Sequence, residues 1–536
     1  MVSVIFDPVQ EYDQKFKELH RNNTQTFFDE LVARSGVDIE QNRETVRRYE
    51  QYLEELSKLS TKLNWLRFWR VLMCITIVLI PLVVLKMTPK IQSLRTQIEE
   101  ADTQADRLQE EAYRQMQPLN ALFTDRDALQ LVEKTLPLLR FEPYFSVRQE
   151  ADMQINYDFR ERDDDEKSTV DVLAGHYNEN PFLFENKRIH TMGMETYHGS
   201  KTIYWTESYI DSDGKMRTRS KSQTLRATVQ KPKPFYSTQV VLNYCCQGGP
   251  DLSFSRDATN LDQKSEREIQ RLVKRGERKL ERKEDRAIRE NDDFTSMANT
   301  EFEVLFDALD RTDEVQFRTL FTPLAQTNMV SLILSRIGFG DDFNFVKNRR
   351  SNRIVSEHSQ GRAINLLAGC YRSYSFDVIQ RQFVGKNTAF FKAVYFDFAP
   401  LWAIPIYQER PVHSLKPIPQ YDRLYAYKEC EALANAVPER HVVHPLTKTQ
   451  AILKSTFVEN RDRIEQITVT AFSYDIEHRV DYVSVHGDDG FWHDVPVEWY
   501  EYVPLEQTNS FGIATDEAAE GRPAIASRNG LCIFDL

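Results

Sequence analysis

One stretch of the sequence combines an aspartate with an acid-x-lysine triplet in the way that some metal-dependent nucleases do. Asp171 is followed by the triplet that begins at Glu185 and ends at Lys187. In such a site the carboxylates bind a hard cation and the lysine steadies the attacking hydroxide. An Asn-Pro pair interrupts the strand that would carry the second acid, and acid-x-lysine triplets are common by chance. We therefore regard Asp171, Glu185 and Lys187 as candidate catalytic residues, and ordinary surface positions as the favoured interpretation.

A second group of candidates surrounds a predicted turn near the C-terminus. His486, Asp488 and His493 lie within one short stretch. Imidazole and carboxylate ligands suit zinc or iron, so these three are candidate metal ligands. The alternative, which we favour, is that they only stabilise the turn at Gly487–Gly490. We therefore predict no bound metal.

Motifs for cofactor chemistry are missing from the sequence. It has only 18 glycines, and it contains no phosphate-binding loop, dinucleotide fingerprint or nucleophile elbow. We predict no cofactor and regard catalysis as the less favoured class of function. The formal charge of −12 argues against general nucleic-acid binding, which needs a basic surface.

The feature that organises the chain is an apolar run without any charged residue, Val71–Leu85. As a helix it would cover about 22 Å of a hydrocarbon core about 30 Å thick. Arg70 and Lys86 can extend this span by snorkelling, and three aromatic residues precede the run at interfacial positions: Trp65, Phe68 and Trp69. We predict a transmembrane segment over 67–89, which makes the lipid bilayer a partner. The alternative is a buried core helix.

The flanking charges and the cysteines bear on the orientation of this single-pass segment. The cations near the run are almost evenly divided between its two sides: Lys58, Lys62, Arg67 and Arg70 before it, and Lys86, Lys90 and Arg95 after it. They give no positive-inside bias. The chain has six cysteines, too few for a disulfide scaffold, and all but Cys74 lie outside the run. This pattern favours a reducing compartment, so we place the soluble body on the cytoplasmic side of the membrane.

Helical patterns flank the apolar run on both sides. Residues 1–66 form a helical N-terminal region, whose 3-4 alternation is interrupted by Asn42 and Ser60. Residues 90–117 continue the alternation as a coiled-coil-like stalk, through Ile91, Leu94, Ile98, Ala101, Ala105, Leu108 and Ala112. Two interpretations stay open: a stalk that forms a homo-oligomer, or an amphipathic helix packed on its own chain.

The rest of the chain predicts a strand-rich body with inserted helices. A first strand-rich domain covers 125–255, and its clearest hairpin pairs Thr202–Ile210 with Lys215–Val229 across an Asp-Ser-Asp-Gly turn. Residues 260–345 contain a highly charged helix and a pair of helices. A second α+β domain covers 346–505, and aromatic residues over Thr388–Phe398 indicate a strand within it. The small, polar composition of 506–536 indicates a flexible tail.

One segment of the body resembles a known family. The stretch FEVLFDALDRTDEVQFRTLFTPLAQTNMVSLI, Phe302–Ile333, is similar to a segment of bacterial membrane-anchored proteins of unknown function. The resemblance is confined to this stretch, and it implies an N-terminal membrane segment followed by an α+β body. It implies no catalytic residues.

These observations predict an α+β protein with N-terminal helices, one transmembrane segment, a stalk and a strand-rich body. The function that we expect is a membrane-anchored scaffold that interacts with other proteins. One alternative is a metal-dependent hydrolase or nuclease tethered to the membrane, in which Asp171, Glu185 and Lys187 would converge. The other is a membrane-tethered sensor with an apolar ligand pocket.

Overall fold

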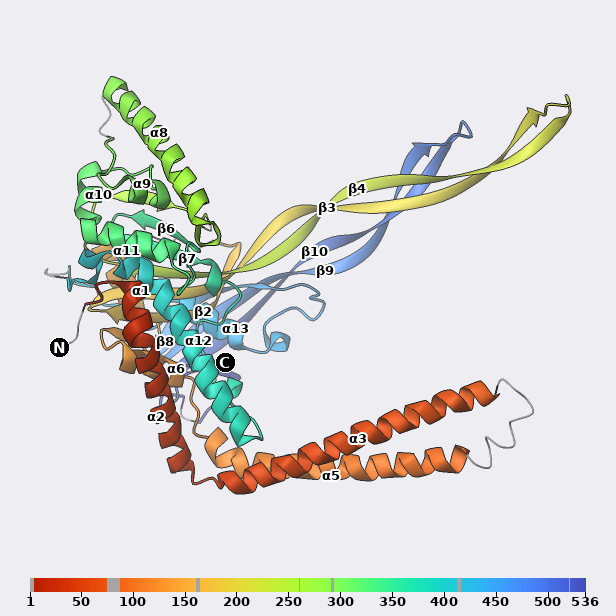
Figure 1. The fold of residues 1–536 in the computed structure, drawn as a ribbon, viewed down its shortest axis with the longest axis horizontal. Helices are drawn as coiled ribbons and strands as arrows, with labels where there is room; N and C mark the ends of the chain where they lie inside the picture. Colours follow the sequence, from red (N-terminus) through yellow and green to blue (C-terminus); the bar gives the residue numbers. More distant parts are fainter. Residues whose placement is uncertain are drawn as a thin grey trace.

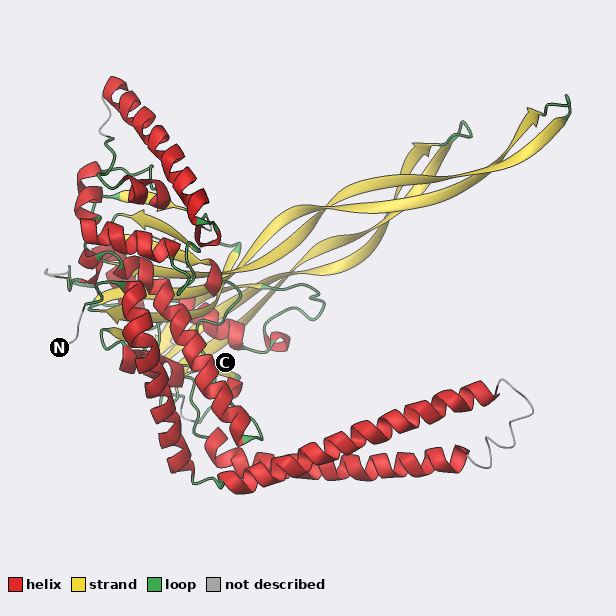
Figure 2. Ribbon diagram, viewed as in Figure 1, coloured by secondary structure: helices red, strands yellow, loops and turns green. Residues whose placement is uncertain are grey.

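The computed structural model describes residues 4–74, 87–160, 164–259, 261–290, 294–411, 416–519 and 521–536. The chain forms an α+β body from which a helical arm and two long β-hairpins project (Figures 1 and 2). The α+β class predicted from the sequence is confirmed. The helical arm and the hairpins leave the body toward the same end of the molecule (Figure 1).

The N-terminal helices build part of the body and the helical arm. They are α1 (Pro8–Glu11), a π-helical turn (Tyr12–Phe16), α2 (Lys17–Ser35), α3 (Ile39–Cys74) and α5 (Thr88–Asn120). Asp7 caps α1 by accepting hydrogen bonds from the backbone N–H groups of Val9 and Gln10, and α2 ends at Gly36, whose φ is 63°. Helices α3 and α5 run side by side as the helical arm (Figure 1).

Two antiparallel sheets make up the β structure of the described residues. The seven-stranded sheet has the order β1-β2-β3-β4-β7-β6-β5, with strands β1 (Leu139–Phe141), β2 (Lys167–Tyr177), β3 (Asn180–Ile210), β4 (Met216–Cys245), β5 (Ser253–Arg256), β6 (Phe343–Asn348) and β7 (Ser351–Ser356). The five-stranded sheet has the order β11-β12-β10-β9-β8, with strands β8 (Ile452–Arg461), β9 (Ile464–His486), β10 (Trp492–Thr515), β11 (Ala526–Arg528) and β12 (Leu531–Asp535). Because β6 and β7 complete the first sheet, the predicted domain boundary at residue 346 falls inside a strand.

The remaining helices belong to the body. They are α6 (Asp127–Thr135), α7 (Val147–Tyr157), α8 (Glu266–Glu290), α9 (Thr300–Phe306), α10 (Glu314–Leu320), α11 (Pro323–Leu334), α12 (Phe376–Trp402) and α13 (Tyr427–Ala436). Short 3₁₀ turns occupy Leu261–Gln263, Glu357–Ser359, Ala368–Cys370, Pro405–Gln408 and Glu439–His441. The predicted charged helix is α8, and the predicted pair of helices is α10 and α11.

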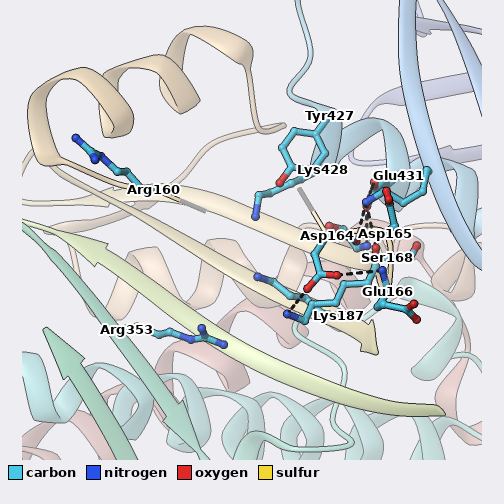
Figure 3. Close-up of a pocket in the computed structure, with 13 residues that line it drawn as sticks. Arg160, Asp164, Asp165, Glu166, Ser168, Lys187, Arg353, Tyr427, Lys428 and Glu431 are labelled. Carbon is cyan, nitrogen blue, oxygen red and sulfur yellow. Dashed lines mark hydrogen bonds and ion pairs between the residues drawn. The ribbon is translucent and has the colours of Figure 1, made fainter. Parts of the chain in front are cut away.

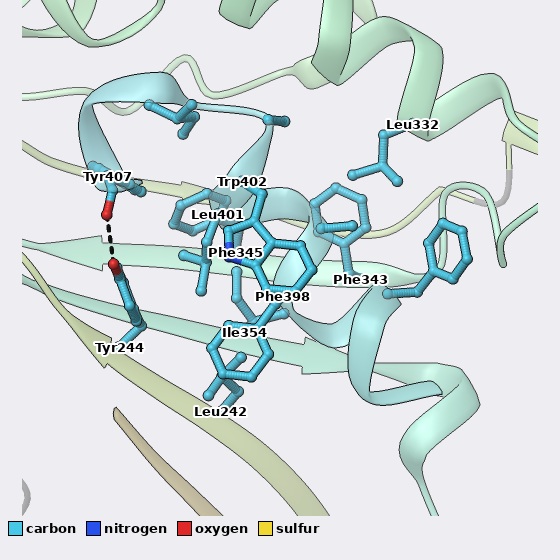
Figure 4. Close-up of a cluster of buried hydrophobic side chains, with 14 of the residues drawn as sticks. Leu242, Tyr244, Leu332, Phe343, Phe345, Ile354, Phe398, Leu401, Trp402 and Tyr407 are labelled. Carbon is cyan, nitrogen blue, oxygen red and sulfur yellow. Dashed lines mark hydrogen bonds between the residues drawn. The ribbon is translucent and has the colours of Figure 1, made fainter. Parts of the chain in front are cut away.

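The strand predicted over Thr388–Phe398 is wrong, because this stretch lies in α12. The second half of α12 is buried on nearly every side, so its aromatic residues follow one another without a helical period. Phe398 and Trp402 stack on each other and contact rings of β2 and β3, and Tyr407 just beyond them meets Tyr244 of β4 (Figure 4). This cluster belongs to the main hydrophobic core.

The flexible tail predicted over 506–536 is also wrong. Residues up to Thr515 continue β10, and β12 returns to pair with it, Ile513 opposite Ile533. The side chains of Leu531 and Ile533 are fully buried in a core that they share with residues of α13. The small and polar residues that suggested disorder lie largely between these strands.

The predicted transmembrane segment falls largely outside the described residues. Helix α3 ends at Cys74, and the rest of the apolar run, residues 75–85, lies in the part that is not described. Within the described residues, no helix combines the length and the apolar character that a membrane crossing requires. The stalk predicted over 90–117 corresponds to α5, whose apolar stripe packs on α3 of its own chain: Ile91 lies with Leu63 and Leu66.

Candidate functional site

A large polar cavity lies where β2 and β3 meet α13 and β8, and its volume is about 630 Å³ (Figure 3). Charged side chains dominate its wall. Among the described residues that line it, six are cationic (Arg160, Lys167, Lys187, Arg353, Lys428 and Lys454) and four are acidic (Asp164, Asp165, Glu166 and Glu431). We call this cavity the basic cavity.

A buried ion cluster forms the inner wall of the basic cavity. Glu185 of β3 is fully buried, and it pairs with Lys187 at 3.1 Å and with Lys428 of α13. Asn243 of β4 donates a hydrogen bond of 2.7 Å to the same carboxylate. A buried carboxylate is tolerated when it is paired and hydrogen-bonded in this way. Strand alternation explains the placement, because Leu183, Glu185 and Lys187 share one face of β3, and Leu183 packs with Ala432 of α13.

A second, buried ion pair lies in the wall of the cavity. Lys454 of β8 lies 3.0 Å from Glu431 of α13, and its ammonium group also donates to the backbone carbonyl oxygens of Asp164 and Lys167. The other carboxylate oxygen of Glu431 accepts a hydrogen bond from the backbone N–H of Thr169 at 2.8 Å. Charged side chains therefore join α13, β8 of the five-stranded sheet and the start of β2.

The structure brings together two of the three candidate catalytic residues. Glu185 and Lys187 form the pair just described, but Asp171 pairs with Arg528 of β11. Arg528 also binds Glu429, and although burial alone would lower the pKa of Arg528, these two acids raise it. Asp171 follows a bulge in β2 and stands opposite Asn186 in the register. Among the described residues, no group of three or more His, Cys, Asp or Glu is placed to hold a metal ion.

The candidate metal ligands His486, Asp488 and His493 lie at the end of the β9–β10 hairpin. His493 contacts Asp489 at 2.8 Å, and His486 lies edge-on against Trp492. The backbone N–H of Asp488 donates to the Gln223 side chain of β4 at 2.8 Å. These contacts shape the turn and tie it to the neighbouring hairpin.

The sequence analysis missed most of the basic cavity. Lys428 and Glu185 are 243 positions apart, and no spacing rule connects them. One local signal was present: Glu185 and Lys187 interrupt an apolar strand at buried positions, which requires charged partners from elsewhere in the fold. Most of the lysines in the wall are paired with acids, and Arg160 and Arg353 add positive charge, so a cavity of this size suits a small anionic ligand.

Comparison with known proteins does not assign a family. No family model matches the chain, and neither does any curated protein or solved structure. The role of this molecule therefore has to follow from its own geometry.

Proposed function

We propose that this protein is a membrane-attached scaffold that holds other proteins at a bilayer surface. The apolar run Val71–Leu85 begins in the last turn of α3 and lies between α3 and α5 in the sequence. The end of α3 and the start of α5 lie at the end of the helical arm that is remote from the body (Figure 1). A helix of 36 residues is about 54 Å long, so the end of α3 lies well clear of the body.

The observation that carries the proposal is the surface at the end of the helical arm. Trp65 and Phe68 of α3 are 61% and 63% exposed, and each contacts Trp69 edge-on. Exposed Lys62, Arg67 and Lys90 accompany them. Tryptophan beside basic residues is typical of a segment at the lipid headgroup level, where aromatic rings and anionic headgroups both bind.

The arm favours attachment from one side over the predicted single crossing. Leu63 and Leu66 of α3 pack against Ile91 of α5, so the segments that flank the apolar run lie next to each other. Residues before the run belong to the body as well, since Tyr12 shares one core with Tyr395 of α12. In our proposal the run therefore enters and leaves the bilayer on the same side.

Two further observations support the proposal. Among the described residues, the cysteines outside the arm are free thiols, which fits a body in a reducing compartment such as the cytoplasm. The β9–β10 hairpin exposes aromatic side chains, among them Tyr482, Phe491 and Trp492, which are residue types that protein interfaces favour. Asp171 is bound by Arg528 and does not join Glu185, so we do not propose the hydrolase alternative.

Vesicle flotation of the full-length protein tests the proposal. We expect Val78→Asp together with Leu82→Asp to lower vesicle binding at least about tenfold, because two charges would have to enter the bilayer. The matched control introduces the same change at two exposed apolar positions on the body, Val315→Asp and Ile288→Asp, and should bind like the wild type. A wild-type protein that remains unbound with every vesicle composition would refute the proposal.

The basic cavity favours a second candidate function, the binding of a small anionic ligand. This ligand would be a multiply charged anion, since Arg353 and Arg160 add to the lysines of the wall. Isothermal titration with inorganic pyrophosphate tests this function. Arg353→Gln should weaken binding about tenfold, and Arg372→Gln, a cation outside the cavity, should not. Equal binding by these two variants would contradict a ligand site in the cavity.

A further inference from the structure

The β3–β4 hairpin extends past the end of its neighbour. Nearer the body, Ile203 and Leu225 of this hairpin pack against Val495 and Val497 of β10. The β9–β10 hairpin stops at its turn, where Asp488 is hydrogen-bonded to Gln223. Residues 206–221 continue beyond it to the far end of the molecule (Figure 1). We call this segment the β tip.

The turn at the end of the β tip is polar, with Asp211, Asp213 and Lys215, and two exposed apolar side chains lie directly behind it. Ile210 and Met216 stand opposite each other at the last pair of the hairpin, and they are 70% and 78% exposed. Tyr204, just before the β tip, is also largely exposed. These side chains belong to no hydrophobic core of the described residues, so they are available for a contact outside the chain.

Basic side chains lie beside these apolar residues. Between Lys215 and Arg226 there are five cations and no acid, although the whole chain has a charge of −12. Two of these cations are paired with acids of the other strand and turn, Arg217 with Asp211 and Lys221 with Glu207, and Asp213 lies in the same turn. Exposed apolar side chains beside a run of cations suit the headgroup region of an anionic bilayer.

The position of the β tip points to the same bilayer as the helical arm. Both project to the same end of the molecule, the helical arm in red and orange and the β tip in yellow-green (Figure 1). We propose that the β tip is a second membrane contact, in which Ile210 and Met216 enter the headgroup region of an anionic bilayer. This proposal rests on the proposed membrane attachment and adds a second point of contact, which would set the orientation of the body.

The test places an environment-sensitive fluorophore on the β tip of the full-length protein through Ser212→Cys, in a background that carries Cys74→Ser and Cys370→Ser. With phosphatidylcholine vesicles that contain phosphatidylserine, we expect the emission to shift to the blue. Ile210→Ser together with Met216→Ser should abolish this shift and weaken vesicle binding about tenfold. The control pair, Tyr482→Ser with Phe491→Ser, removes similarly exposed rings from the shorter hairpin and should leave the shift unchanged.

The outcomes separate the two proposals. If the wild type binds vesicles but the probe does not respond, the second contact is refuted and the attachment through the helical arm stands. If the protein binds no vesicles, both proposals fail. A blue shift that needs no lipid and grows with protein concentration would show that a second copy of the chain covers the β tip, which also overturns the second contact.

Discussion

At the scale of single residues, the buried charged side chains act mainly as structural contacts between elements. Glu185 holds two lysines from different elements, Lys187 and Lys428, inside the wall of the basic cavity. The carboxylate that the nuclease pattern singled out thus joins β3 to α13. Its role in the fold can be separated from a catalytic role by measuring stability.

Glu185→Gln should lower the free energy of unfolding by about 3–5 kcal/mol, because both lysines would keep a buried charge without a full counter-charge. Chemical denaturation followed by circular dichroism measures this loss. Glu166→Gln, which removes an exposed acid at the rim of the same cavity, is the control and should change stability by less than about 1 kcal/mol. Equal stability of the two variants would contradict the structural role of Glu185.

Two buried histidines should make stability depend on pH in opposite directions. Burial opposes protonation of His358, but Asp397 and Asp342 outweigh it and raise the pKa of this ring. His358 therefore stabilises the fold below about pH 6.5, and this contribution is lost as the pH rises through its folded-state pKa. Burial lowers the pKa of His20 to about 4, so His20 destabilises the fold as the pH falls from about 6.5 toward that value.

Melting temperatures across this pH range check the expectation. His358→Gln should flatten the alkaline side of the profile, and His20→Gln should flatten the acidic side. Profiles that keep their shape in both variants would show that other groups control the pH dependence.

At the scale of elements, the two polar residues that interrupt the helical alternation lie in different environments. Asn42, which interrupts the helical alternation, is fully buried at the base of the helical arm. Its side chain donates to the carbonyl oxygen of Tyr374 at 3.0 Å and accepts from the N–H of Phe376 at 3.0 Å, so it joins α3 to the start of α12. Ser60, the other interruption, is exposed along the arm.

The C-terminal strand β12 offers a prediction at this scale. Leu531→Ala should cost about 2–5 kcal/mol of stability, because Leu531 is fully buried in the core of the second sheet. Leu536→Ala, at the same end of the chain and 55% exposed, should change stability by less than about 0.5 kcal/mol. Thermal or denaturant unfolding compares the two. If both variants behave alike, the C-terminal residues do not form part of the sheet in solution.

At the scale of the whole molecule, the packing of the first helices on the body bears on the proposed membrane topology. Ile5 exchanges hydrogen bonds with Gln408, although 403 positions separate the two residues in the sequence. A chain that crossed the bilayer once through 67–89 would separate these partners and expose the core that they share. We therefore propose that both flanks of the apolar run stay on the side of the bilayer where the body lies.

Tags at the two termini distinguish this topology from a single crossing. We expect a tag before residue 1 and a tag after residue 536 to be digested, or protected, together when sealed membranes are treated with protease. In our proposal both termini lie on one side of the bilayer, because the first helices pack on the body and β12 pairs with β10 of the same body. Digestion of one terminal tag with full protection of the other would restore the single-pass topology.

Local patterns in the sequence determined the α+β class, the β3–β4 turn at Asp211–Gly214, the helices α10 and α11, and the apolar run. Each of these features depends on residues only a few positions apart, so hydrophobic periodicity and turn-forming residues are enough to predict it. Only the tertiary structure decided that Thr388–Phe398 is helical, that the C-terminal residues form β12, and that Lys428 meets Glu185. Those outcomes depend on burial and on partners far away in the sequence. A helix that is buried on all sides shows no periodic pattern of apolar residues, and a buried charge is stable only when the fold places a counter-charge beside it.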